Sequence, residues 1–174
     1  MSEARIEAYA RAIIDIAEAE GNLAVVENEL FRVARAVESS DQLRATLTDE
    51  TIPAVRRQAV IEALLGAASN TTTQLVGMVV GAGRGRDLPG IIDKVVKRAS
   101  SSQGKEVAEV RTAVELTADQ QARLAAALER ATGKQINLKV VVDPSVLGGV
   151  VATVGDSVID GSVRSRLDQV KSRL

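Results

Sequence analysis

Residues 100–116, SSSQGKEVAEVRTAVEL, mark the place where the apolar pattern of this 174-residue chain changes its period. Ser100 to Gly104 is a run of small and polar residues of the kind that separates folded segments. From Glu106 to Leu116 every second residue is then apolar or Thr, an alternation typical of a β-strand. We therefore expect two domains, one over residues 1–104 and one over residues 105–174.

The sequence before this boundary has the three-to-four-residue spacing of amphipathic helices. Gly21, Gly66 and the glycines between 81 and 85 are expected to end helices, and Asn22 is expected to cap the second one. The connections between the helical segments are short, which favours a six-helix bundle. The expected helices cover residues 3–20, 22–39, 41–47, 53–65, 71–80 and 87–99.

The sequence after the boundary predicts strand, helix, strand, hairpin and helix, a small α+β unit. Thr117 and Gln120 form a capping box that begins a helix, which Gly133 ends. Strands are expected at 136–142, 150–154 and 157–160, and a helix closes the chain. The fold class is thus mainly α with α+β. Structural turns are expected at Gly148, Gly149, Gly155, Asp160 and Gly161.

Composition excludes several functions. The chain has no His and no Cys, so the commonest general base and the commonest soft metal ligands are missing. Aromatic residues make up 1% and the net charge is −1, which argues against nucleic-acid binding. The N-terminus lacks the apolar stretch of a signal peptide, and no segment approaches the roughly 20 apolar residues of a membrane span. We expect a cytosolic protein that is not an enzyme.

Two patterns invite a catalytic interpretation and have a simpler one. Gly81-Ala82-Gly83-Arg84-Gly85 suggests a phosphate loop, but it follows an apolar helix rather than a strand, and no Gly-Lys-Ser/Thr is present. Asp156 and Asp160 suggest a carboxylate pair, but turn chemistry accounts for both. The sequence therefore predicts no catalytic, cofactor-binding or metal-binding residues.

Three helices are candidates for binding a protein partner. The apolar arc of helix 3–20, from Ile16 through Ile6 to Ile14, spans roughly 160°, wider than a surface helix needs, and helix 71–80 is apolar almost all round. Either feature fits a partner-binding groove or plain central burial. The last helix has a basic side with Arg164, Arg166 and Lys171, which fits a solvated face or docking to an acidic protein.

The C-terminal strings VDPSVLGGVV (142–151) and GDSVIDGSVRSRL (155–167) closely resemble the delta subunit of F-type ATP synthases, the family of the oligomycin-sensitivity-conferring protein. Tyr9-Ala10-Arg11-Ala12 is similar to that family's Tyr-Ala-x-Ala opening. Ile13-Ile14 and Ala152-Thr153 depart from the family pattern, which puts individual contacts in doubt. The resemblance covers essentially the whole chain.

The resemblance implies a stator subunit without cofactor. Residues 1–104 would hold the N-terminal segments of the alpha subunits of the catalytic head, and residues 105–174 would meet the b subunits of the peripheral stalk. It implies a location at the cytoplasmic face of the bacterial membrane without insertion into it. The alternative is an unrelated cytosolic helical adaptor. The b-subunit contacts are expected at Arg164, Arg166 and Lys171, and the alpha-subunit groove at Ile6, Tyr9, Ala10, Ile13, Leu75 and Val79.

Overall fold

The computed structural model describes residues 3–49, 51–66 and 68–161 of the chain. They fall into two compact units, unit 1 (Met1–Ala99) and unit 2 (Ser100–Leu174). The division lies slightly before the boundary expected from the sequence and falls within the last turn of the helix Leu88–Ser102.

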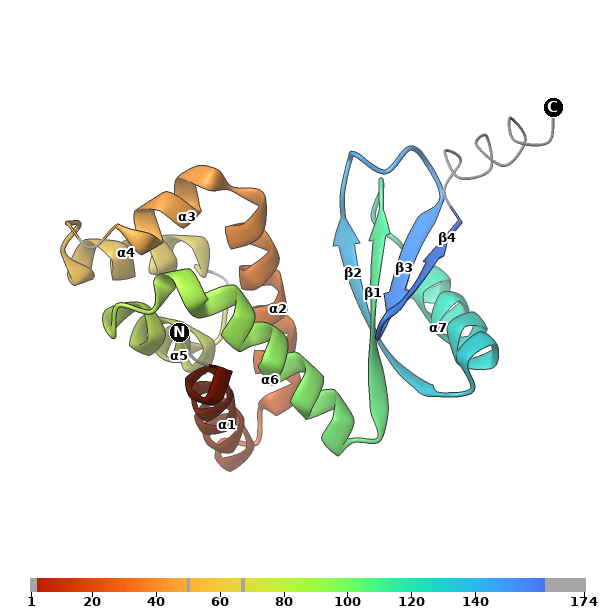
Figure 1. Ribbon diagram of the computed structural model, residues 1–174, viewed down its shortest axis with the longest axis horizontal. Coiled ribbons are helices and arrows are strands. Elements are labelled where there is room, and N and C mark those ends of the chain that lie inside the picture. The colour runs from red at the N-terminus through yellow and green to blue at the C-terminus, as the bar shows by residue number, and fades with distance from the viewer. Residues whose placement is uncertain (1–2, 50, 67, 162–174) are drawn as a thin grey trace. The chain divides into compact units, whose positions relative to one another are not determined.

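Six α-helices occupy the described part of unit 1, and every one of them buries apolar side chains (Figure 1). Ala10, Leu30, Ile61, Val76 and Ile91 are among the residues with no more than 1% of their surface exposed. Aliphatic and alanine side chains thus fill a core with almost no aromatic residue. The helices are α1 (Glu3–Ala19), α2 (Leu23–Ser39), α3 (Asp41–Thr48), α4 (Ala54–Leu64), α5 (Asn70–Gly81) and α6 (Leu88–Ser102), with a 3₁₀ turn η1 (Gly85–Asp87) before α6.

One helix cap differs from the prediction. Asn22 stands at the N-cap of α2, but its side chain makes no capping hydrogen bond. Its amide nitrogen donates instead to Thr71 Oγ1 of α5 at 2.8 Å. The side chain therefore links the α1–α2 turn to the start of α5 and does not cap α2.

The glycine-rich segment after α5 is a site of close packing. Gly85 is buried, and a Cβ atom at this position would lie 2.2 Å from the carbonyl oxygen of Leu47 at the end of α3. Gly83 has a positive φ of 73°. The spacing of these glycines is therefore explained by a turn that lets η1 approach α3.

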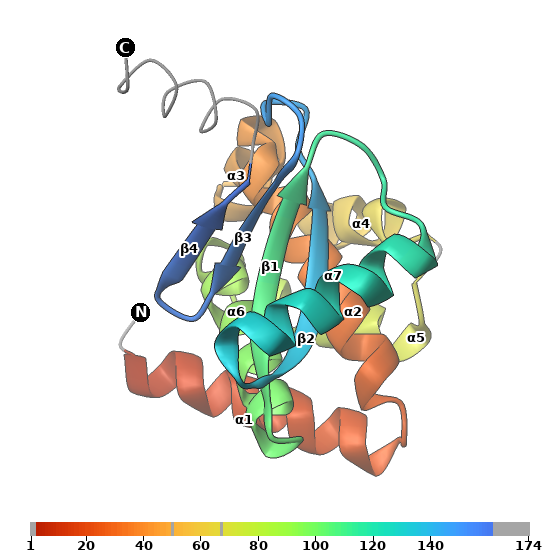
Figure 2. The ribbon, with the colours of Figure 1, turned by 90° about the vertical axis from the view of Figure 1, so that its right-hand side faces the viewer.

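Unit 2 contains a four-stranded mixed sheet in its described part, with the strand order β2-β1-β3-β4. β1 and β2 are parallel and are joined by α7, which lies across one face of the sheet (Figure 2). β3 pairs antiparallel with β1 and with β4. This confirms the predicted combination of helices with a small α+β part. The elements are β1 (Lys105–Thr112), α7 (Ala118–Thr132), β2 (Gln135–Val142), β3 (Val150–Val154) and β4 (Ser157–Asp160).

The first strand is shorter than its alternating pattern predicts. We expected a strand to Leu116, but β1 ends at Thr112. Thr112 pairs with Val142, the last residue of β2, and with Val150, the first residue of β3. Beyond this point no neighbouring strand remains to accept hydrogen bonds, so the prediction was wrong for residues 113–116.

The turns around β3 and β4 use glycine at three positions with positive φ, namely 69° at Gly148, 75° at Gly149 and 57° at Gly155. Gly155 and Asp156 form the two-residue connection between β3 and β4, since Val154 pairs with Ser157. Asp160 is the last residue of β4 rather than a turn residue, because it pairs with Val151. The N–H of Gly161 donates to the carbonyl of Val150 at 2.9 Å.

Candidate partner-binding surfaces

The groove residues expected from the sequence divide into two groups in the structure. Ile6 and Tyr9 are half-buried on α1. The other four are at most 3% exposed and belong to the core of unit 1; they are Ala10, Ile13, Leu75 and Val79. Central burial therefore accounts for most of the apolar excess on α1 and α5.

Two apolar side chains on the same helices remain accessible. Ile16 of α1 is 38% exposed and Met78 of α5 is 42% exposed. Tyr9 and Ile16 are seven residues apart, so both project from the same edge of the buried face of α1. We call Ile6, Tyr9, Ile16 and Met78 the rim residues. Ile16 belongs to the predicted apolar arc, but periodicity alone could not separate these accessible side chains from the buried ones.

Polar side chains fix the start of α5 against α2 and the α1–α2 turn. Thr71 Oγ1 donates to Glu20 of the α1–α2 turn. The buried carboxylate of Glu29 on α2 accepts hydrogen bonds from Ser69 N–H at 3.1 Å, Ser69 Oγ at 2.7 Å and Thr72 Oγ1 at 2.6 Å. Ser69 also caps α5, because its Oγ accepts from Thr72 N–H. The position of α5 is thus set by this cluster, which periodicity could not reveal.

The same cluster controls the ionisation of Glu29. Burial alone would raise the pKa of its carboxyl group, but the hydrogen bonds from Thr72 and Ser69 and the positive charge of Arg32 outweigh it and hold the pKa below the usual value. Glu29 is therefore a charged acceptor at neutral pH.

Two ion pairs connect α1 to α6 on the surface of unit 1. Lys94 Nζ lies 3.0 Å from Glu3 Oε1, and Arg98 pairs with Glu7 one turn further along both helices. The hydrogen bond and charge of Glu3 raise the pKa of Lys94. These contacts support the orientation of α1, although exposed pairs of this kind contribute little free energy.

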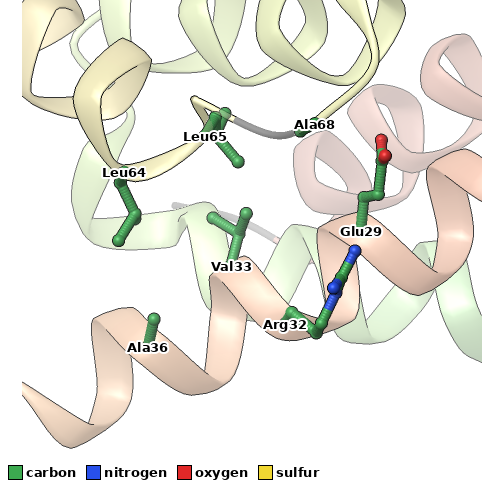
Figure 3. A pocket seen from close by; sticks show the side chains of 7 residues that line it. All are labelled: Glu29, Arg32, Val33, Ala36, Leu64, Leu65 and Ala68. Carbon is green, nitrogen blue, oxygen red and sulfur yellow. The ribbon is translucent and has the colours of Figure 1, made fainter.

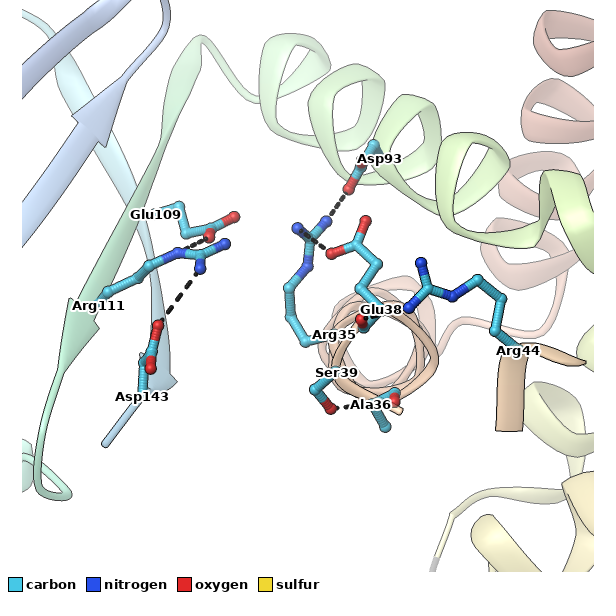
Figure 4. Close-up of polar contacts among 9 residues, drawn as sticks. All are labelled: Arg35, Ala36, Glu38, Ser39, Arg44, Asp93, Glu109, Arg111 and Asp143. Atoms are coloured by element: carbon cyan, nitrogen blue, oxygen red, sulfur yellow. Dashed lines mark hydrogen bonds and ion pairs between the residues drawn. The ribbon is translucent and has the colours of Figure 1, made fainter. Parts of the chain in front are cut away.

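Two arginines, one in each unit, organise further polar contacts (Figure 4). Arg35 of α2 lies 5.1 Å from the ring centre of Phe31 and pairs with Glu38 at 2.8 Å and with Asp93 of α6. Arg111 of β1 pairs with Glu109 at 3.0 Å and with Asp143 at 3.4 Å. Both guanidinium groups are bound to carboxylates of their own unit.

Asp143 is occupied by the turn that follows β2. Its Oδ1 accepts from Ser145 N–H at 2.9 Å and from Ser145 Oγ at 2.6 Å. These hydrogen bonds, with a smaller effect of Arg111, lower the pKa of the Asp143 carboxyl group. The carboxylate thus stabilises a local turn.

Neither a metal-binding cluster nor a membrane-spanning helix is found in the part of the chain that the structure describes. Among the described residues there is no cluster of three or more carboxylates that could hold a metal ion. None of the helices within the described ranges has the length and hydropathy to cross a bilayer. The predicted stalk contacts Arg164, Arg166 and Lys171 lie outside the described residues.

Known proteins resemble the chain over both units. Residues 6–174 match the family described as the ATP synthase delta (OSCP) subunit. The ATP synthase subunit delta of Streptomyces avermitilis is 42% identical over 164 residues, which cover 94% of this chain and 60% of that protein. That of Kineococcus radiotolerans is 40% identical over 164 residues, 94% of this chain and 59% of that protein.

A solved structure shares the fold. A chain of the Toxoplasma gondii mitochondrial ATP synthase hexamer matches with a TM-score of 0.57 and 26% identity, over 97% of this chain and 96% of that chain. By contrast, the chain spans about 60% of the length of the curated relatives that it matches.

Proposed function

Because the chain belongs to the ATP synthase delta (OSCP) subunit family, we propose that it is a non-catalytic stator subunit that ties the alpha subunits of the catalytic head to the b subunits of the peripheral stalk. The observation that carries the proposal is the family match over residues 6–174, which spans both units. Family membership also argues against the alternative of an unrelated helical adaptor.

The proposed work is mechanical. Torque from the rotor would turn the catalytic head unless the head were held against the membrane-fixed stalk. A link of this kind needs two binding surfaces and a stiff body, but no reactive group or cofactor. The absence of His and Cys from the sequence is compatible with that role. The complex would keep the subunit at the cytoplasmic face of the membrane without insertion or nucleic-acid binding.

Unit 1, as a six-helix bundle, would bind the N-terminal helical segments of the alpha subunits. We assign the direct contacts to the rim residues Ile6, Tyr9, Ile16 and Met78, because their side chains are accessible. Ala10, Ile13, Leu75 and Val79 would form the packed floor beneath them. A closely packed floor fixes the rim in place, so little ordering would be needed when the partner helix docks.

The rim can supply useful affinity. Fully burying one large aliphatic side chain contributes about 1.5–3 kcal/mol, and the rim residues begin half-buried or exposed. The gain must exceed association costs of at least several kcal/mol. One such surface therefore favours moderate affinity, which attachment of other subunits in the complex would strengthen.

Unit 2 would bind the C-terminal ends of the b subunits, with Arg164, Arg166 and Lys171 pairing with acidic side chains. Charge reversal at Arg164 and Arg166 together should weaken capture of the b subunit and make the remaining binding less salt-sensitive. Reversal of Arg130, which is exposed on α7, is the matched control. Equal capture by all three proteins would remove the basic residues from the interface.

The alpha-subunit surface can be tested with a synthetic alpha N-terminal peptide. Tyr9→Asp and Ile16→Asp should each lower its affinity at least about tenfold, because a buried carboxylate would face apolar contacts. Val25→Asp, at an apolar position of α2 that is 51% exposed, should leave binding unchanged. Far-UV circular dichroism would show that all variants remain helical. Loss of binding only in unfolded variants would refute the rim.

A further inference from the structure

Two rim residues of α1, Tyr9 and Ile16, lie between two charged residues on the same side of the helix. Arg5, Tyr9, Ile16 and Glu20 follow one another at spacings of four, seven and four residues, so they form one row, which we call the α1 stripe. Arg5, Ile16 and Glu20 are exposed, and Tyr9 is half-buried. At a rise of about 1.5 Å per residue, the two charged ends are about 22 Å apart. The accessible apolar row therefore has a positive and a negative end.

The negative end of the stripe carries more than one carboxylate. Asp15 and Glu18 precede Glu20 near the C-terminus of α1, where the helix dipole already disfavours negative charge, and the last turn contains no basic residue. Neither Asp15 nor Glu18 forms a hydrogen bond or ion pair with any residue in the described ranges, so the fold gives no reason for them. Arg11, one turn before Asp15, offsets part of the charge. Three carboxylates against one guanidinium leave this end negative.

The two helices that hold this end of α1 in place add no positive charge. Residues 23–31 of α2 and the whole of α5 contain no Lys or Arg. Thr71 at the start of α5 donates to Glu20, but its side chain is uncharged. Arg32, the next basic residue of α2, extends toward Glu29, whose negative charge it offsets (Figure 3). The carboxylates at the end of α1 therefore have no counter-charge on α5 or on the adjoining part of α2.

The positive end of the stripe keeps its charge because the neighbouring carboxylates have other partners. Glu3 pairs with Lys94 of α6, and Glu7 pairs with Arg98 of the same helix. Arg5 forms no hydrogen bond or ion pair with any residue that the structure describes. The N-terminal end of the helix dipole has the same positive sign. Arg5 is thus available to a carboxylate from outside the chain.

We propose that this charge distribution determines how a partner helix lies on the rim residues. The helix that fits carries a carboxylate at one end of its apolar face, which pairs with Arg5, and a basic side chain about four turns away, which pairs with Glu20 and Asp15. In the reverse direction both ends would bring like charges together, so one direction is preferred. The inference rests on the proposed function, in which this helix is the N-terminal segment of an alpha subunit. It adds the charge pattern and the direction of that segment, which apolar contacts alone leave open.

The direction of docking can be measured on the full chain, which has no cysteine. Ala8→Cys and Ala19→Cys each introduce one thiol toward one end of the stripe, since both positions are exposed and lie eleven residues apart on one side of α1. The synthetic alpha N-terminal peptide would carry a cysteine at one end or the other, and exchange in a glutathione buffer would measure which disulfides form. The acidic end should be favoured at Ala8→Cys and the basic end at Ala19→Cys, each roughly tenfold.

Charge variants show whether the α1 stripe sets this direction. Arg5→Glu and Asp15→Lys should each lower the affinity for the peptide roughly two- to five-fold in dilute salt, and the loss should fade as salt is added. Together they should remove the disulfide preference. Arg56→Glu and Glu62→Lys, at exposed positions of α4, make the same changes in charge elsewhere and should alter neither measurement. Far-UV circular dichroism would show that all variants remain helical.

The outcomes separate this inference from the proposed function. Equal disulfide formation at both ends of the peptide, or a preference that survives the combined substitution of Arg5 and Asp15, would overturn the inference and leave the tether intact. The same holds for an alpha segment that binds but has no carboxylate and basic side chain at opposite ends of its apolar face. A peptide that does not bind the chain at all would overturn the proposed function, and the inference with it.

Discussion

The two units form their hydrophobic cores from different elements. In unit 1 every described helix contributes to the core, and even a buried carboxylate, that of Glu29, is fully hydrogen-bonded. In the described part of unit 2, which ends at residue 161, one face of a sheet packs against α7, and the buried apolar cluster is small. Val142, Leu147 and Val158 of unit 2 remain exposed. The difference teaches that the core of unit 1 is shared by six helices, whereas the described core of unit 2 is confined to one sheet face and α7.

An Ile→Ala substitution in the core of each unit should have the largest effect and tests the difference between the two cores. Ile91 of α6 is fully buried, and Ile136 of β2 is 7% exposed in the small cluster of unit 2. Ile91→Ala should lower the free energy of unfolding of unit 1 by about 2–5 kcal/mol, and Ile136→Ala should cost unit 2 about 2 kcal/mol. Because the described part of unit 2 has the smaller core, we expect Ile136→Ala to unfold unit 2 at a lower temperature than Ile91→Ala unfolds unit 1.

The single tyrosine makes the two transitions separable. Tyr9 is the only Tyr, the chain has no Trp, and Tyr9 lies in unit 1, so tyrosine fluorescence reports that unit alone. Far-UV circular dichroism reports both units. Ile136→Ala should shift only the dichroism transition. A fluorescence midpoint that moves equally with either substitution would show that the units unfold as one.

The buried carboxylate gives the next largest effect. Glu29→Gln keeps the size of the side chain but removes the charge that Ser69 and Thr72 bind, so unit 1 should lose about 1.5–3 kcal/mol at pH 7. Glu18→Gln, at an exposed position of α1, is the control and should change stability little. Urea unfolding followed by tyrosine fluorescence would measure both. A loss no greater than in the control would mean that the cluster does not hold α5.

The pH dependence of this difference has a defined sign. The pKa of Glu29 is lowered in the folded protein, so its contribution is complete above the unfolded value of 4.5 and disappears as the pH falls through the folded pKa. The stability gap between the wild type and Glu29→Gln should therefore be constant near neutrality and close in acid. A gap that widens on acidification would contradict the assignment.

Helix caps give the smallest effects and sharpen the comparison. Thr117 caps α7 at an exposed site through a reciprocal capping box with Gln120, and Thr117→Ala should cost unit 2 about 0.5–1 kcal/mol. Ser69 caps α5 and also donates to Glu29, so Ser69→Ala should cost unit 1 more, about 2 kcal/mol. Differential scanning calorimetry would compare them. Equal losses would show that the link to Glu29 adds nothing.

Local features of the fold could be predicted from the sequence because they depend on nearby residues. The helix ranges follow from apolar spacing, the α7 capping box from Thr117 and Gln120, and the two-residue hairpin loop from Gly155 and Asp156. The end of β1 could not be predicted, since it depends on where β2 and β3 stop pairing. Periodicity describes one segment at a time, whereas strand length is set by partners.

The proposed binding surface follows less completely from the sequence, for a related reason. Ile13 and Val79 belong to apolar faces, but both side chains are buried by packing within unit 1. The accessible edge, with Ile16 and Met78, depends on which neighbours cover each helix.

A sandwich experiment tests the tether most directly. The alpha N-terminal peptide would be immobilised, the full chain bound to it, and the soluble part of the b subunit then passed over the surface in a biosensor. The account predicts that the b subunit binds only when the chain is present, without releasing it. Release of the chain by the b subunit, or no binding of the b subunit to the captured chain, would contradict a subunit that holds both partners at once.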